Sequence, residues 1–164
     1  MINTVHKILA CLLVTTLILP WFSGCAVPAR KLDADALWVS VEQRQPAAIR
    51  SVTRMHQLQS DYKTIIRITP DASIRGRAYL GLAELDLALG NYKRARHNLV
   101  QALRFDLPPE PRRRALLMLG DTLERHLDSS EDAIMAYQQI VNEHPQTLES
   151  EVAQLRLKML HHEQ

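Results

Sequence analysis

The side chain with the most definite chemistry in this chain is the thiol of Cys25. It follows Ser23 and Gly24, two small residues that leave the neighbouring backbone accessible, at the end of an apolar run from Ile8 to Phe22. A thiolate is a nucleophile that can be alkylated or acylated. The only other cysteine, Cys11, lies inside the apolar run. Cys25 is therefore the candidate for thiol chemistry outside the apolar run, and the pattern argues against disulfide or C-x-x-C chemistry.

The segment before Cys25 has the pattern of a secretory leader. A basic residue, Lys7, precedes the apolar run, which is shorter than the roughly 20 residues of a transmembrane helix. Such a run matches the apolar region of a signal peptide. We therefore expect residues 1–24 to be a signal peptide.

The four residues Phe22-Ser23-Gly24-Cys25 resemble a bacterial lipobox. Ser23, Gly24 and Cys25 match its pattern, whereas Phe22 replaces the usual Leu. The resemblance implies a diacylglyceryl thioether on Cys25, cleavage after Gly24 and acylation of the new amino group. Because Ala26 and not Asp follows, it also implies sorting to the periplasmic face of the outer membrane. An ordinary signal peptide or an uncleaved anchor is the alternative.

Composition indicates what kind of domain follows the leader. We expect residues 25–32 to be a polar tether, which could span at most about 25–30 Å, and residues 33–164 have the length of one domain. The formal net charge of +2 over 164 residues argues against a nucleic-acid-binding protein. Only five glycines and 5% aromatic residues, with abundant Leu, Ala, Arg and Glu, are typical of an all-helical protein.

Three sets of four residues recur at intervals of 37 or 38 residues. They are Leu58, Tyr62, Ile65 and Pro70; Ala95, Leu99, Ala102 and Pro108; and Ala133, Tyr137, Ile140 and Pro145. A helical segment precedes each of the two later sets and ends at a turn, around Gly90 and around Asp128. A fixed period of this length indicates a solenoid of helical hairpins.

These residues resemble the tetratricopeptide repeat, in which small residues let paired helices approach closely and a proline closes the second helix. The resembling positions are Tyr79, Leu82, Ala83 and Gly90 in one copy and Leu119, Gly120 and Leu123 in the next. The resemblance implies an all-α, short right-handed solenoid of helical hairpins with a C-terminal capping helix. We expect repeats at about 72–108 and 110–145, a degenerate first unit at about 33–70 and a cap at 147–160.

Some positions depart from the repeat pattern. Asp86 stands where a bulky residue is usual, which predicts a wetter groove or a rotated helix. Pro46 suits a first helical position, so we expect one long helix over 47–68 after a short helix over 33–43. In the cap, Leu148, Val152, Leu155 and Met159 share one helical face, which we expect to cover the end of the solenoid.

Catalytic motifs are missing from the sequence. It contains no G-x-S-x-G, H-E-x-x-H, P-loop or G-x-G-x-x-G pattern, and its histidines are scattered except for His161-His162. Glu84 and Asp86 are two residues apart and so point to different sides of a helix. We therefore expect no enzyme activity, no metal, no small-molecule substrate and no cofactor beyond the lipid on Cys25.

In tetratricopeptide proteins the first helix of each pair lines a groove that grips peptides. The resemblance implies that the partner-binding positions here are Arg77, Leu80, Glu84, Leu87, Arg114, Leu117, Asp121 and Glu124. A basic cluster adds Lys93, Arg94, Arg96, Arg104 and Arg112-Arg113-Arg114. It is either a docking surface for anionic lipid or an acidic partner, or a solvated face balanced by nearby acids.

These features together predict a membrane-anchored scaffold or adaptor lipoprotein that binds an envelope protein through its repeats. The stretch from Ala136 through Pro145 is similar to repeats of the lipoprotein of the β-barrel assembly machinery and of the periplasmic Tol–Pal coordinator. A pilotin-like factor for secretin or pilus assembly is one alternative. An accessory regulator of a cell-wall or polysaccharide enzyme is another.

Overall fold

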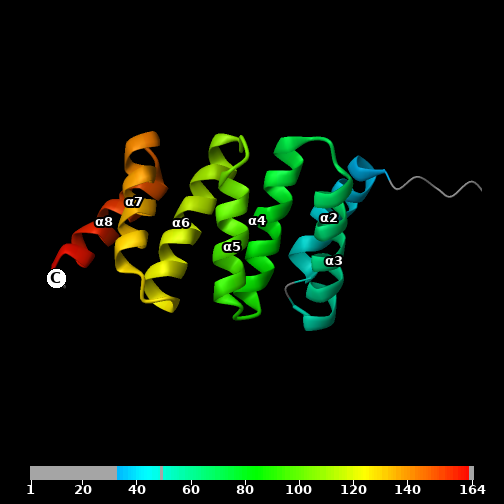
Figure 1. Cartoon of the computed structure of the whole chain (residues 1–164), viewed down its shortest axis with the longest axis horizontal. Coiled ribbons are helices and arrows are strands. Elements are labelled where there is room, and N and C mark those ends of the chain that lie inside the picture. The colour runs from blue at the N-terminus through cyan, green and yellow to red at the C-terminus, as the bar shows by residue number, and fades with distance from the viewer. Residues whose placement is uncertain (1–32, 49, 163–164) are drawn as a thin grey trace, which may run out of the picture. The chain divides into compact units, whose positions relative to one another are not determined.

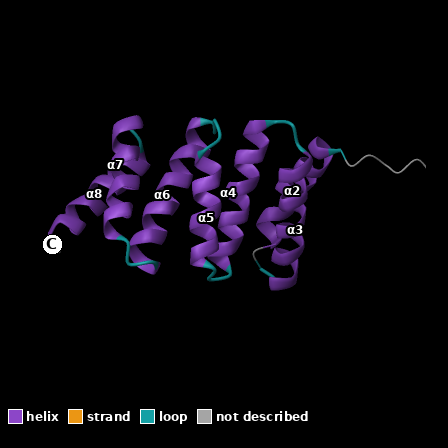
Figure 2. Ribbon diagram, in the orientation of Figure 1, coloured by secondary structure: helices purple, strands orange, loops and turns teal. Residues whose placement is uncertain are grey.

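The computed structural model describes residues 33–48 and 50–162, so the expected signal peptide, Cys25 and its tether lie outside the described residues. The described residues form seven helices and no strand (Figure 1, Figure 2). The helices are α2 (Ala34–Ala48), α3 (Val52–Ile68), α4 (Ala72–Ala88), α5 (Tyr92–Leu103), α6 (Pro109–His126), α7 (Ser130–Glu143) and α8 (Leu148–His162). The expected all-α class is confirmed. None of these helices is both long and apolar enough to cross a membrane.

The helices of residues 33–162 are arranged as a row of hairpins. Each helix packs on the next one along the chain, which gives the pairs α2–α3, α4–α5 and α6–α7, followed by α8 beside α7 (Figure 1). Helix α6 also contacts α4 and α8, and side chains of α2 bond to α4 through Glu42 and Gln45, so the first helices of the hairpins and α8 share one face. We call the surface of α2, α4, α6 and α8 the first-helix face. The arrangement is the hairpin solenoid that the repeat predicted.

The turn between α4 and α5 follows from local chemistry. Gly90 has a φ of 73°, a left-handed conformation that costs glycine little because it has no Cβ. The Gly90 amide donates to the carbonyl of Leu87 at 3.0 Å, and the Asn91 amide donates to the carbonyl of Asp86 at 2.7 Å. These bonds satisfy carbonyls at the end of α4 and reverse the chain.

The first unit differs from the expected long helix over 47–68. Helix α2 continues through Pro46 to Ala48, and α3 begins only at Val52, after an extended Ser51. Pro46 therefore lies in the last turn of a helix and not in its first. Since proline lacks an amide hydrogen, it removes one helical bond there, and the helix ends two residues later. The first unit is consequently a complete hairpin.

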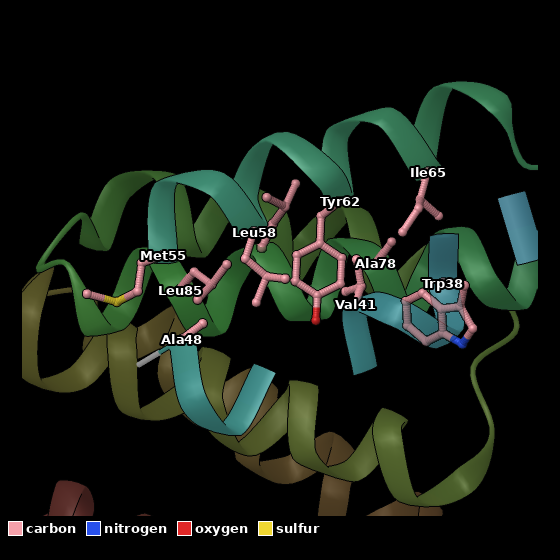
Figure 3. Packing of buried hydrophobic residues seen from close by; sticks show 10 residues of the cluster. Trp38, Val41, Ala48, Met55, Leu58, Tyr62, Ile65, Ala78 and Leu85 are labelled. Atoms are coloured by element: carbon pink, nitrogen blue, oxygen red, sulfur yellow. The ribbon is translucent and has the colours of Figure 1, made fainter. Parts of the chain in front are cut away.

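Residues from α2, α3 and α4 form the core of this first hairpin (Figure 3). On α3 the buried residues Met55, Leu58, Tyr62 and Ile65 follow helical spacing and form one apolar stripe. The ring of Tyr62 points into the core, with its centroid 6.2 Å from that of Trp38 on α2. The repeat set predicted from the sequence is thus the packing face of α3.

Asp86 has a different role from the expected one. Its side chain is fully buried, and its carboxylate accepts hydrogen bonds of 2.8 Å from both Gln59 Nε2 and Asn98 Nδ2. Arg94 Nη2 lies 2.9 Å from the same carboxylate. Because these donors come from α3 and α5, the carboxylate ties three helices together. A buried charge with this many partners requires neither a wet groove nor a rotated helix.

Helix α8 is the expected cap, but the predicted packing face is wrong. Leu148 and Leu155 are 74% and 60% exposed, whereas Ser150, Ala153 and Leu160 are buried. The buried side of α8 also includes Leu157, which packs against the core of the last hairpin. The predicted residues lie on the other side of the helix and face away from the solenoid.

Candidate functional site

The first-helix face carries ion pairs that join the first helix of one hairpin to the first helix of the next. Glu42 of α2 pairs with Arg77 of α4, and Glu84 of α4 lies 3.3 Å from Arg114 of α6. The guanidinium of Arg77 also lies 4.9 Å from the ring centroid of Trp38. Three of the predicted groove residues are therefore joined in pairs that connect one hairpin to the next.

The same arrangement continues from α6 to α8. Arg156 of α8 lies 3.4 Å from Glu124 and 3.7 Å from Asp121, both on α6. Glu124 also accepts a 2.7 Å hydrogen bond from the hydroxyl of Tyr137, and burial raises the pKa of that tyrosine. Arg125 adds a 2.7 Å contact to Asp121. The predicted acidic positions of α6 thus hold the cap in place.

The predicted apolar positions of the groove are less accessible than the resemblance implied. Leu80 is 1% exposed and packs in the core with Leu99 and Leu107, so its assignment to the partner-binding surface is wrong. The physical reason is that α5 and α6 both pack over this side of α4. Leu87 and Leu117 are half-buried, and Leu117 packs against the core of the last hairpin.

Glu84 lies at the centre of a closed polar cluster. The hydroxyl of Tyr62 donates to Gln45 Oε1 at 2.9 Å, and Gln45 in turn donates to Glu84. Burial raises the pKa of Glu84, while the neighbouring Arg114 opposes that shift. The cavity beside this cluster measures about 50 Å³, the space of one or two water molecules. This part of the first-helix face is therefore filled by its own side chains.

The basic cluster divides into two parts. Arg112 makes a bidentate contact with Glu143 at 2.8 and 3.2 Å, and this hydrogen bonding lowers the pKa of Glu143 to about 2. Arg113 lies 3.2 Å from Glu149, and Arg114 pairs with Glu84. The run of three arginines is thus balanced by acids from other helices.

The second part of the basic cluster is not balanced. Arg94 pairs with Asp86, but Lys93, Arg96 and Arg104 have no carboxylate within ion-pair distance among residues 33–48 and 50–162. Helix α5 itself contains no acidic residue, and α7 contains no basic one. A basic surface on α5 therefore stands beside an acidic α7.

An open cleft of about 550 Å³ lies between these two helices. Leu119 and Leu123 of α6, with Ala136 of α7, line it with apolar surface. Val100 of α5 and Met135 of α7 also line the cleft and are 39% and 61% exposed. The volume is within the range of clefts that bind ligands or peptide side chains.

The edges of the cleft are charged. Arg96 and Arg104 line its α5 side, and Asp132 lines its α7 side. A partner segment with apolar residues and a carboxylate edge would match this distribution. We call the surface formed by these three residues and the apolar lining the α5–α7 cleft.

Sequence reasoning did not find the α5–α7 cleft. The sequence signal that could have indicated the cleft was an apolar residue outside the buried stripe of its helix. On α5 the buried stripe is Ala95, Leu99 and Ala102, and Val100 lies off it; Met135 has the same relation to the buried residues of α7. The cleft exists because α5 and α7 lie apart, and the spacing of residues in the sequence does not predict that separation.

The described residues offer little for catalysis. No group of three His, Cys, Asp or Glu side chains in residues 33–48 and 50–162 could hold a metal ion. Glu84 and Asp86 belong to separate hydrogen-bonded clusters, as their spacing predicted. Both carboxylates are engaged with amide and guanidinium donors.

Comparison with known proteins supports the repeat. The sequence model of the tetratricopeptide repeat family matches residues 114–147, which span α6 from Arg114, α7 and the turn before α8. No curated protein matches this chain. Repeats of this family serve as protein–protein interaction modules. Residues 114–147 therefore match a tetratricopeptide repeat, and they lie in a solenoid of helical hairpins.

Proposed function

We propose that this chain is a lipid-anchored adaptor of a bacterial cell envelope that holds a protein partner in the α5–α7 cleft. The observation that carries the proposal is the cleft itself. It combines exposed apolar side chains with two arginines that lack an ion-pair partner in the described part of the chain. The occupant we propose is a partner segment whose apolar residues fill the cleft and whose carboxylates contact Arg96 and Arg104.

The anchor rests on the sequence before the helical domain. The apolar leader and the residues Phe22-Ser23-Gly24-Cys25 support lipidation of Cys25. Two or three acyl chains on one residue would bind a membrane stably, whereas a single chain binds marginally. Ala26 supports the periplasmic face of the outer membrane as the location.

The anchor is tested by metabolic labelling of the full chain with palmitate in a Gram-negative host. Cys25→Ser should abolish the label and stop processing of the leader. Cys11→Ser is the matched control and should keep both, because Cys11 lies in the segment to be removed. Label retained in Cys25→Ser would refute the lipobox.

The partner site is tested by co-purification from the native envelope. We compare Arg96→Glu/Arg104→Glu with Arg54→Glu/Arg67→Glu, an equal charge change on exposed residues of α3. Proteins that depend on the cleft should be recovered about tenfold less with the first variant and normally with the second. Equal recovery with both would contradict the assignment of the site.

The identity of the recovered proteins separates the alternatives. Recovery of barrel-assembly, secretin or pilus components would support an assembly adaptor. Recovery of a cell-wall hydrolase or a polysaccharide synthase would support a regulator of that enzyme. The proposed adaptor has no catalytic role of its own, in agreement with the scaffold character of the repeat family.

A further inference from the structure

Helix α8 has apolar residues on two opposite sides. One side packs on α6 and α7 through Ala153, Leu157 and Leu160. The other side is an exposed stripe, which we call the outer stripe; it consists of Leu148, Val152, Leu155 and Met159, with exposed fractions of 74%, 38%, 60% and 44%. A helix that is apolar on two sides usually lies between two partners. In the described part of the chain, only the side of α8 that faces α6 and α7 is covered by other helices.

The spacing of the outer stripe is that of a helix–helix seam. Its members are separated by four, three and four residues, which is the a/d spacing of a heptad repeat over two heptads. The spacing is also symmetric about its centre. When a second copy of α8 runs antiparallel, Leu148 therefore faces Met159 of that copy, and Val152 faces Leu155.

The charges beside the outer stripe have the same symmetry. The first half of α8 carries Glu149 and Glu151, and the second half carries Arg156 and Lys158. In an antiparallel pair the acidic half of each helix lies along the basic half of the other. Glu149 and Arg156 already pair with α6. Glu151 and Lys158 are exposed, and no ion pair engages them within the described residues.

We propose that the outer stripe is a docking surface for a second copy of this chain, joined through an antiparallel α8–α8 contact with twofold symmetry. The contact would be isologous, because the same surface is used by both copies. Four apolar residues per copy are few compared with the roughly 800 Å² that each partner buries in a standard interface. The dimer should therefore be weak and should form at high local concentration. The outer stripe shares no residue with the α5–α7 cleft, so the dimer proposal does not depend on the proposed partner site.

The geometry is tested by cysteine cross-linking of the full chain in membranes. Leu148→Cys and Met159→Cys are made in chains with different affinity tags, expressed alone and together, and oxidised. The parent chain without an added cysteine supplies the background from Cys11 and Cys25. Co-expression should give a mixed dimer between the two tags.

Each variant expressed alone should give no cross-link. In the antiparallel contact two identical positions would lie eleven residues apart along the helix, which is about 16 Å. Cross-linking of Leu148→Cys to itself would indicate a parallel contact and overturn the proposal. Absence of the mixed dimer would also overturn the proposal. This outcome includes the result that a different protein covers the outer stripe.

The charge symmetry supplies a second test that leaves the apolar residues in place. In Glu151→Lys or Lys158→Glu both ion pairs of the dimer become repulsive, and the mixed cross-link should fall about fivefold or more. Combining a Glu151→Lys chain with a Lys158→Glu chain restores opposite charges at both contacts and should restore the yield. Yields that do not respond to these charges would contradict the antiparallel pairing.

Discussion

Substitution of Gly120 by alanine tests a close contact between α6 and α7, at Tyr137. A Cβ added at Gly120 would lie 2.4 Å from Cε1 and 2.7 Å from Cζ of the Tyr137 ring. Favourable carbon–carbon contacts lie at about 3.5–4.0 Å, so the overlap is about 1 Å. Tyr137 is fully buried, and its hydroxyl is bonded to Glu124, so the ring cannot move away without disturbing that bond.

One favourable and two unfavourable contributions set the size of the change in the free energy of unfolding. Alanine is favoured over glycine inside a helix by about 1 kcal/mol. Overpacking costs typically about 1–3 kcal/mol, and weakening the hydrogen bond from Tyr137 to Glu124 costs about 1 kcal/mol more. We expect Gly120→Ala to lower the free energy of unfolding by about 1–3 kcal/mol, measured by urea denaturation.

A matched background separates steric overlap from other causes. In the preceding hairpin the positions of Gly120 and Tyr137 are held by Ala83 and Leu99, both buried. In a Tyr137→Leu background, Gly120→Ala should therefore cost at least about 1 kcal/mol less than in the wild type. An equal cost in the two backgrounds, or a neutral effect in the wild type, would refute the close contact.

Three further predictions concern individual side chains. Asp86→Ala leaves Gln59 and Asn98 without their buried acceptor, so the free energy of unfolding in urea should fall by about 2–4 kcal/mol; a loss below about 1 kcal/mol would contradict the network. The Glu143 carboxylate has a folded pKa of about 2, below its ordinary 4.5, so its stabilisation is present above pH 4.5 and is lost as the pH falls toward 2. Because Glu143 is about one-third exposed, we expect this loss to be about 0.5–1 kcal/mol in acid melts and absent in Glu143→Gln; identical pH profiles would contradict it. Gly90→Ala should cost about 1–2 kcal/mol through its left-handed φ alone, since no atom lies within 4 Å of the added Cβ, and unchanged melting would exclude that strain.

The hairpin solenoid could be predicted because its information is local and repeated. Small residues and buried tyrosines recur at fixed spacing, and glycine and prolines mark the turns. The first unit was harder, because Pro46 is compatible with both the first and the last turn of a helix. The choice is made by packing of Trp38 and Val41 against α3, which is a tertiary effect.

The surfaces were less predictable than the fold. In α8 both sides are apolar, and periodicity alone cannot say which side packs. The side that packs combines the small Ser150 and Ala153 with Leu160, and contacts with α6 and α7 decide the choice. The resemblance placed Leu80 on the groove, but helices α5 and α6 cover it. Ion pairs such as Glu84 with Arg114 join residues far apart in sequence, so the division of the basic cluster could not be read from the chain.

Site-specific photo-cross-linking in living cells tests most directly that this protein is an adaptor with its partner in the α5–α7 cleft. A photoreactive residue is placed at Met135, which lines the cleft, and for comparison at Ser60, which is exposed on α3. We predict a discrete adduct with an envelope protein from position 135 and none from position 60. The adduct should disappear when Arg96→Glu/Arg104→Glu is added. No adduct from position 135, or the same adduct from both positions, would contradict the proposed function.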